Sequence, residues 1–331
     1  MASLPKNIYE QQAQNRRLTV VVLGGFILFV GLLGLGLDMF VLGYSPGADE
    51  GMGLFSLPVA TIAAVGLGGI GAARSAAGGD TAVLASSTAV PVDENDPKYR
   101  QLVNVVDEMS IASGLTRPKI YIIPDPDPNA FATGLKPERA AIAVTEGLVE
   151  RLNREELQAV VAHEMGHIRN LDIRLMTVVA ALIGTVLLLS EFGTRMMRFG
   201  GVRSGGKKSG KDSGGGLGIL MVVWIVALIL APIISQLLAM AVSRQREYLA
   251  DASAAELTRN PLALASALEK IDKAVEPTRA IKKGTAHLCI ADPLGRPANE
   301  REGVAADLFA THPPIAKRVA LLRGMAYQKV V

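Results

Sequence analysis

The stretch that decides the fold is His163-Glu164-Met165-Gly166-His167, an HExxH pattern inside a run with the periodicity of an amphipathic helix. Residues four apart on an α-helix lie on one face, one turn from each other, so His163 and His167 can bind the same metal ion. The glutamate between them would lie beside that ion without being a ligand, where it can act on a water molecule. The alternative is a pair of helix histidines that only line a core or a solvated face.

The residues around the motif predict a compact mixed unit. Helical periodicity covers residues 98–113, and β-rich runs separated by glycine and proline cover 119–123, 129–133 and 140–145. Asn153, with Glu156 three residues later, resembles a capping box and predicts the start of the motif helix. The motif therefore lies on a helix that has its own start signal.

A catalytic zinc usually has three protein ligands and a water, so the two histidines need a third partner. The metzincin pattern is excluded because Ile173 occupies the position of its third histidine. Glu191 ends an apolar run and has no acidic residue one turn away. Glu247 is the better candidate, because Asp251 lies one turn further on the same face and can accept a hydrogen bond from a ligand histidine. The alternative is a solvated charge cluster in which Glu247 pairs with Arg244.

The composition of the 331-residue chain indicates membrane segments. Half of its residues are hydrophobic, and the mean hydropathy of +0.32 is high for a soluble protein. A net charge of +3, from 34 basic and 31 acidic residues, gives no overall field that would favour nucleic acid, and we expect no such partner. The single cysteine, Cys289, excludes an intrachain disulfide and CxxC zinc sites and fits a reducing compartment.

Two uncharged runs, 18–37 and 52–73, are each long enough to cross a bilayer as a helix. Residues 1–17 end in Arg16 and Arg17, whereas the loop between the runs carries acidic residues and no lysine or arginine. The positive-inside rule therefore predicts that 1–17 and everything after 73 are cytoplasmic. The first run is too long for the apolar part of a cleaved signal peptide. The alternative is two buried core helices.

Two further apolar segments, 175–189 and 217–242, are separated by a flexible Gly/Ser/Lys linker at 200–216. If both segments crossed the bilayer, the linker would lie outside. Its basic residues favour the cytoplasm instead. Two transmembrane helices remain possible, and a hairpin that dips into the membrane or packs on its face would satisfy the charges.

Three motifs together resemble the HtpX family of membrane metalloproteases, which are gluzincins related to the CaaX prenyl endopeptidases. They are HEMGH at 163–167, SRQREYLADA after the long apolar run, and FATHPP at 309–314. The resemblance implies a mainly α fold with a small β-sheet, in a multi-pass α-helical protein of the plasma (inner) membrane. The zinc metalloprotease domain would cover 91–331, interrupted by the two later apolar segments. The long linker departs from the family pattern and puts any copied topology in doubt.

Carried over by position, the resemblance implies that His163, His167 and Glu247 bind one Zn²⁺ and that Glu164 is the general base and acid. It also brings His312 near the active site, where it could stabilise an oxyanion. The alternative for the segment at 311–314 is an ordinary capped, proline-led helix start.

Asn129, Ala130 and Phe131 are candidates for substrate binding, since an edge strand there could pair with an extended peptide. The alternative is an internal strand.

The resemblance implies cytoplasmic-side cleavage of misfolded or damaged membrane proteins under stress, with unfolded or membrane proteins as substrates and the lipid bilayer as partner. Two other functions compete with this one. The first is a processing protease of narrow specificity for prenylated or signal-peptide-like substrates. The second is an inactive metal-binding scaffold, against which the intact Glu164 argues.

Overall fold

The computed structural model describes residues 8–40, 44, 57–182, 246–274, 278–281, 285–293 and 313–327. Within these ranges the chain is mostly helical with one small mixed sheet, as the sequence predicts. It divides into two compact units, of which Met1–Thr19, Ser75–Ala181 and Leu237–Val331 form the first, and Val20–Arg74 and Leu182–Gln236 the second. The predicted linker 200–216, the segment 217–242, the later part of 175–189 and His312 lie outside the described residues.

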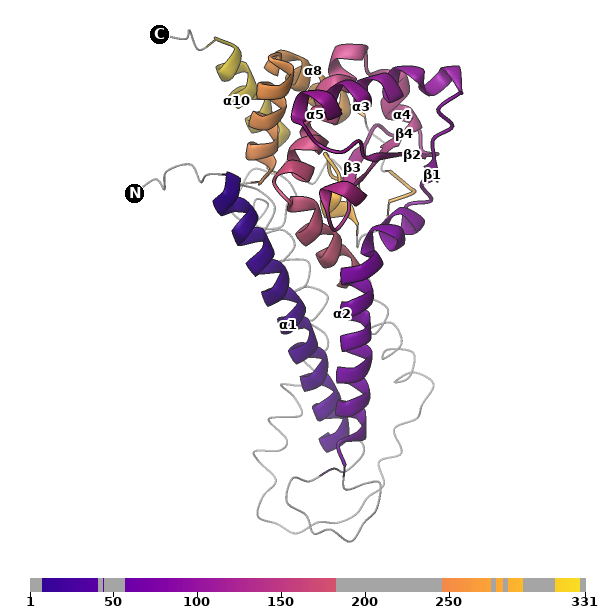
Figure 1. The fold of residues 1–331 in the computed structure, drawn as a ribbon, viewed down its shortest axis with the longest axis vertical. Coiled ribbons are helices and arrows are strands. Elements are labelled where there is room, and N and C mark those ends of the chain that lie inside the picture. The colour runs from indigo at the N-terminus through magenta and orange to yellow at the C-terminus, as the bar shows by residue number, and fades with distance from the viewer. Residues whose placement is uncertain are drawn as a thin grey trace, which may run out of the picture. The chain divides into compact units, whose positions relative to one another are not determined.

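The sheet of the first unit has four strands in the order β1-β2-β4-β3 (Figure 1). These are β1 (Val90–Pro91), β2 (Lys119–Ile123), β3 (Ala130–Thr133) and β4 (Ala141–Thr145). Strands β2 and β4 are parallel, and the other two pairs are antiparallel. The three runs predicted as strands are confirmed, whereas the two-residue β1 was not predicted.

Both faces of the sheet are covered, which explains why every residue of β4 is buried. Alternate side chains of a strand point to opposite faces. Ile142 and Val144 belong to the core that the sheet forms with the helices α3, α5 and α8. Ala141 and Ala143 belong to a second core with Met176. The sheet is thus a fixed platform against which the motif helix lies.

The helices of the first unit follow local signals in the sequence. They are α3 (Arg100–Ser113), α4 (Glu146–Arg151), α5 (Arg154–Arg169), α8 (Pro261–Asp272) and α10 (Ile315–Tyr327), with helical stretches also at 172–182 and 246–258. Short 3-10 turns are η2 (Pro97–Tyr99), η3 (Pro137–Arg139) and η4 (Ala286–Leu288). Helix α5 packs against α3, α8 and β3, and α10 packs against α8 (Figure 1). The motif helix is therefore enclosed on several sides.

The capping box predicted for the motif helix is present. The Asn153 side chain accepts a hydrogen bond from the Glu156 amide at 2.9 Å, and the Glu156 carboxylate accepts one from the Asn153 amide at 2.9 Å. The same carboxylate accepts hydrogen bonds from Ser266 and Lys270 of α8, both at 2.7 Å. One side chain thus begins α5 and also ties it to α8.

We expect Glu156→Ala to lower the free energy of unfolding by about 2–3 kcal/mol at neutral pH, because it removes a cap and a charge-assisted hydrogen bond. Burial acts to raise the pKa of Glu156, but Lys270, Ser266 and the Asn153 amide outweigh it and lower the pKa. Because the pKa of this carboxyl is lower in the folded state, its ionisation stabilises the fold at pH values above the unfolded-state pKa. This stabilisation disappears as the pH falls through the folded-state pKa. Urea unfolding should therefore show a smaller difference from wild type in acid.

The exposed neighbour Glu155, in the same helical turn, provides the matched control. Glu155→Ala should change the free energy of unfolding by less than about 0.5 kcal/mol, as most surface substitutions do. An equal effect of the two substitutions would contradict the dual role of Glu156.

The N-terminal helices extend beyond the runs predicted from hydropathy. Helix α1 (Ile8–Phe40) begins before residue 18, and its part Gln12–Gly36 is long and apolar enough to cross a membrane. Helix α2 (Val59–Ser86) continues past 73 and has a non-helical backbone at Gly78. Its parts Val59–Ser75 and Ala77–Ser86 pass the same test only as a pair joined across a break.

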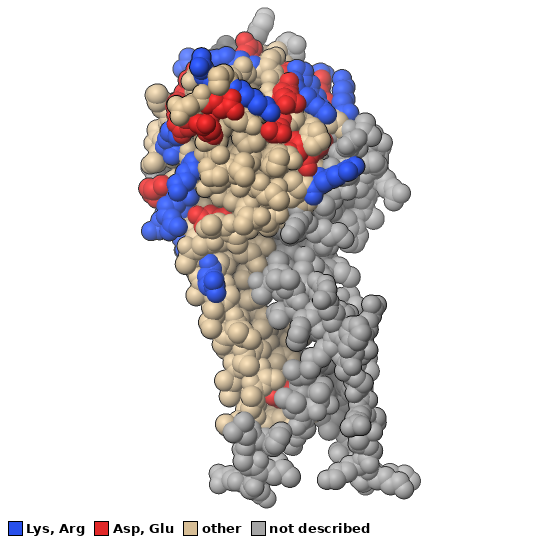
Figure 2. All heavy atoms as spheres, turned by 90° about the vertical axis from the view of Figure 1, so that its right-hand side faces the viewer, with Lys and Arg blue, Asp and Glu red and all other residues tan. Residues whose placement is uncertain are grey.

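The described surface of the second unit is apolar. Among its described residues only Asp38 and Arg74 carry a charge. Its exposed hydrophobic side chains, with exposed fractions of 40% to 67%, are Val20, Val21, Leu28, Leu32, Leu57, Val59, Ile62, Val65, Leu67 and Ile70. On the face shown in Figure 2, lysines, arginines and carboxylates gather over the first unit. Such continuous exposed apolar surface is typical of contact with lipid or another protein.

Asp38 is buried because it serves the second unit internally. Its carboxylate accepts hydrogen bonds from the amides of Ala60 and Thr61 at 2.8 and 2.6 Å, at the start of α2. An acidic side chain at a helix N-terminus satisfies free N–H groups and the positive end of the helix dipole. One turn earlier in α1, Gly34 approaches α2 so closely that a Cβ would lie 2.8 Å from the Ala60 carbonyl oxygen.

Residues 175–181 of the predicted membrane-associated segment 175–189 belong to the first unit. Residues 175–182 are helical, and Leu175 and Val178 are almost fully buried. Met176 and Ala180 contribute to the core on the second face of the sheet. The hydropathy of this half is therefore explained by protein packing, and membrane association of the remainder stays a prediction.

Candidate metal centre

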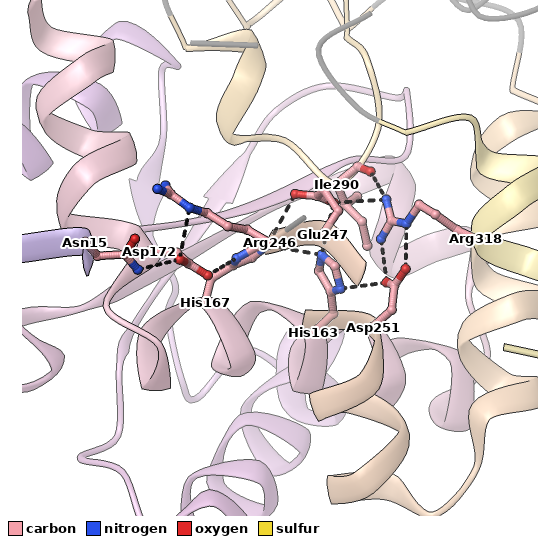
Figure 3. A network of polar contacts seen from close by, with 9 residues as sticks. All are labelled: Asn15, His163, His167, Asp172, Arg246, Glu247, Asp251, Ile290 and Arg318. Carbon is pink, nitrogen blue, oxygen red and sulfur yellow. Dashed lines mark hydrogen bonds and ion pairs between the residues drawn. The ribbon is translucent and has the colours of Figure 1, made fainter. Parts of the chain in front are cut away.

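Three side chains predicted as metal ligands converge inside the first unit. His163 and His167 lie on α5, Glu247 lies on the helical stretch 246–258, and all three are buried. The Nε2 atoms of the two histidines are 3.3 Å apart. The Glu247 carboxylate lies 3.5 Å from Nε2 of His167 and 3.6 Å from Nε2 of His163 (Figure 3).

These separations fit a tetrahedral zinc ion. Ligand atoms about 2.0–2.1 Å from a tetrahedral zinc are about 3.3–3.4 Å from each other. Two imidazoles and one carboxylate are also a ligand set of catalytic zinc sites, in which the fourth position is left for water or substrate. The residues present therefore fit the metal.

A carboxylate lies behind each histidine. The Asp251 Oδ1 atom is 3.0 Å from Nδ1 of His163, and the Asp172 Oδ2 atom is 3.2 Å from Nδ1 of His167. Carboxylates in these positions fix the ring orientation and increase the basicity of the ligand nitrogen. Asp251 was predicted from the sequence and Asp172 was not.

Arg318 of α10 holds the carboxylates on one side of the cluster. Its guanidinium donates to both oxygens of Asp251, at 2.9 and 2.7 Å, and to the carbonyl of Ile290 at 2.9 Å. It also lies 3.1 Å from Glu247. Burial acts to lower the pKa of Arg318, but Asp251 and Glu247 outweigh it and raise the pKa, so the side chain stays charged.

The carboxylates around the two histidines raise the pKa of both imidazole rings. For His163, burial acts to lower the pKa, but the carboxylates of Asp251 and Glu247 outweigh burial and raise it. For His167, burial again acts downward, and Asp172 and Glu247 raise the pKa well above its usual value. A metal must displace protons from these rings, so metal affinity should decrease as pH falls.

Glu164 faces the interior next to strand β3 and is 1% exposed. Its carboxylate oxygens accept no well-formed hydrogen bond from the described residues. Burial raises the pKa of Glu164, although His163, His167 and the backbone of Ala132 act in the opposite direction. A raised pKa makes a carboxylate a stronger base, which suits it to taking up a proton during a reaction.

Of the predicted substrate-binding residues, Ala130 and Phe131 lie on the edge strand β3 and Asn129 directly precedes it, and all three already have internal partners. The Asn129 amide donates to Thr278 at 3.2 Å and to the Ala291 carbonyl at 3.1 Å. The Ala130 carbonyl accepts from the Ile290 amide at 2.9 Å, and Phe131 forms a bridge with Cys289. Substrate binding by Asn129, Ala130 and Phe131 stays a prediction.

A buried cluster of two helix-borne histidines and a carboxylate, beside a glutamate on the same helix, defines the class of the HExxH metallopeptidases. A model of peptidase family M48 matches residues 97–326. The chain belongs to this family, and within it to the HtpX proteases.

Curated relatives support this assignment over almost the whole length. A protease HtpX homolog of Thermoanaerobacter pseudethanolicus is 40% identical over 320 residues, covering 97% of this chain and 98% of that protein. The homolog of Ligilactobacillus salivarius is 38% identical over 324 residues, covering 96% and 100%. A superposition on the crystal structure of S. mikatae Ste24p covers 95% of this chain and 66% of the Ste24p chain, with 17% sequence identity. Its TM-score of 0.47 is too low to establish a common fold.

Proposed function

We propose that this protein is a membrane-held zinc endopeptidase in which His163, His167 and Glu247 bind one Zn²⁺. The observation that carries the proposal is the set of ligand-atom separations of 3.3 to 3.6 Å in a buried cluster. Membership of a peptidase family supports hydrolysis of peptide bonds as the reaction.

In the proposed mechanism Glu164 takes a proton from the attacking water and later transfers it to the leaving amine. Zinc, when bound, would polarise the water and the substrate carbonyl. Asp251 and Asp172 keep the histidine rings aimed at one point, and Arg318 keeps Asp251 and Glu247 in place. His312 is our proposed donor for the developing oxyanion, and pairing of substrate with residues 129–131 is our proposed mode of binding.

The proposal includes attachment to the plasma membrane with the active site on the cytoplasmic side. The exposed apolar residues of α1 and α2 and the absence of lysine and arginine between these helices support it. The domain would extend over 91–331, with 175–189 and 217–242 associated with the membrane. Quality control of misfolded or damaged membrane proteins under stress is the role that we favour over narrow-specificity processing.

The proposal can be tested with the purified full-length protein in detergent and an unfolded substrate such as casein. We expect cleavage that stops when a chelator removes the metal and returns when one equivalent of zinc is added. Cleavage that continues at the same rate after complete metal removal would contradict a zinc mechanism. Activity restricted to a prenylated or signal-like peptide would favour the processing role.

A further inference from the structure

The first turns of α1 lie against the C-terminal end of the motif helix. The side-chain amide of Asn15 donates to the Asn170 carbonyl at 3.0 Å and to Oδ1 of Asp172 at 2.8 Å. The amide of Gln12 donates to the Arg169 carbonyl at 2.8 Å. Asn15 is 1% exposed, so its two contacts are made in the interior of the first unit, and Figure 3 shows the one with Asp172.

The local backbone explains why this end of α5 needs donors. The last carbonyls of a helix have no N–H partner within the helix and require one from elsewhere when buried. After Asn170 the chain turns through Leu171, whose φ of 59° is a left-handed conformation that residues other than glycine rarely adopt. This turn brings Asp172 back beside His167, at the point where the amides of α1 arrive.

The two oxygens of Asp172 have different partners. Oδ2 faces Nδ1 of the ligand His167 at 3.2 Å. Oδ1 accepts the 2.8 Å hydrogen bond from Asn15 and lies 3.5 Å from Nε of Arg246. The hydrogen bond from Asn15 has a length that orients the carboxylate, whereas the contact to Arg246 is longer than a normal hydrogen bond and acts through its charge.

The orientation of the Asn15 amide is itself well determined. Its nitrogen faces two acceptors, the Asp172 carboxylate and the Asn170 carbonyl, whereas its oxygen has no hydrogen-bond partner among the described residues. The flipped amide would place an oxygen against both acceptors and lose both bonds. The Asn15 side chain is therefore a hydrogen-bond donor to the Asp172 carboxylate, which in turn contacts His167.

We infer that Asn15 is a positioning residue for the zinc ligand His167, acting through Asp172. Asn15 lies in the first turns of α1, which belong to the same unit as the motif helix, so these turns would also be part of the metal centre. The inference rests on the proposed zinc site. It predicts that zinc affinity depends on the docking of α1 and not only on the motif helix.

The test is the zinc affinity of the full-length protein in detergent, measured against a competing chelator. Loss of a group that directly orients a ligand weakens binding about 10- to 100-fold. Asn15 is one hydrogen bond further away, so we expect Asn15→Leu to weaken zinc binding about three- to tenfold. Gln12→Leu is the matched control, because it removes an α1 amide from the same helix end without touching Asp172, and it should change affinity less than about twofold.

Two further readouts separate positioning from docking alone. In an Asp172→Asn background, Asn15→Leu should have little additional effect on zinc affinity, because Asn15 acts on His167 only through the Asp172 carboxylate. Cobalt-substituted Asn15→Leu should show an altered visible absorption spectrum, and cobalt-substituted Gln12→Leu the wild-type spectrum. Asn15→Asp, which keeps the size but removes the donor, serves if the leucine variant does not fold.

Wild-type affinity in both Asn15 variants, or equal losses in the Asn15 and Gln12 variants, would overturn the inference and leave the zinc site intact. A wild-type protein that binds no zinc would instead overturn the proposed function.

Discussion

Glu164→Gln is expected to reduce the turnover number for peptide hydrolysis by about a hundred- to ten-thousandfold while zinc remains bound. Glutamine has nearly the same size but cannot accept a proton, so the variant loses general base catalysis. Glu164 is not among the three residues whose ligand atoms converge, and its removal should leave the metal site intact. Steady-state cleavage of an unfolded substrate at saturation and zinc analysis of the same sample measure both quantities.

The control for this substitution is Glu155→Gln, an exposed glutamate in the first turn of the same helix. It changes the charge of α5 equally and should retain wild-type turnover. If Glu164→Gln cleaved as fast as wild type, the proton would have to be carried by another group.

Glu247→Ala is expected to weaken zinc binding by more than about a hundredfold, the second of the two large effects. Substituting a residue that hydrogen-bonds to a metal ligand already weakens metal affinity about 10- to 100-fold. Glu247 would supply one of the three ligand atoms themselves, so its loss should have a larger effect. The buried guanidinium of Arg318, 3.1 Å from this carboxylate, would also lose one of its two carboxylate partners and keep only Asp251. Competition with a chelator of known affinity measures the loss.

Glu256→Ala is the matched control, since Glu256 lies on the same helical stretch and its side chain is 69% exposed. Zinc affinity should be unchanged in that variant. Full zinc affinity in Glu247→Ala would require a different third ligand.

The strands and the motif helix could be predicted from the sequence because their signals are local. The capping residue Asn153, its partner Glu156 and the HExxH pattern all lie within one helix and its cap. The early start of α1 could not be predicted in the same way. Its first turns are polar and lack apolar periodicity, and their burial at Asn15 depends on residues about 155 positions away.

The ligand cluster was predictable because two of its members are one helical turn apart and the third has Asp251 one turn beyond it. Asp172 was missed, since on a continuing helix it would lie about 140° around the axis from His167. The left-handed turn at Leu171 changes that placement.

The sequence around Arg318 does indicate that this arginine is buried. It lies on the face of α10 that carries the buried side chains of Ile315, Val319 and Leu322. A charged residue at such a position is rarely buried without a partner. The spacing therefore indicates a buried acidic group, although it does not identify Asp251 or Glu247.

The most direct test of the central claim is X-ray absorption at the zinc edge, recorded on the full-length protein with one zinc bound. We predict two imidazole nitrogens and carboxylate or water oxygens at about 2.0–2.2 Å, and no sulfur neighbour. Scattering from a sulfur at about 2.3 Å would contradict the account, because Cys289 is the only cysteine in the chain and is not part of the cluster.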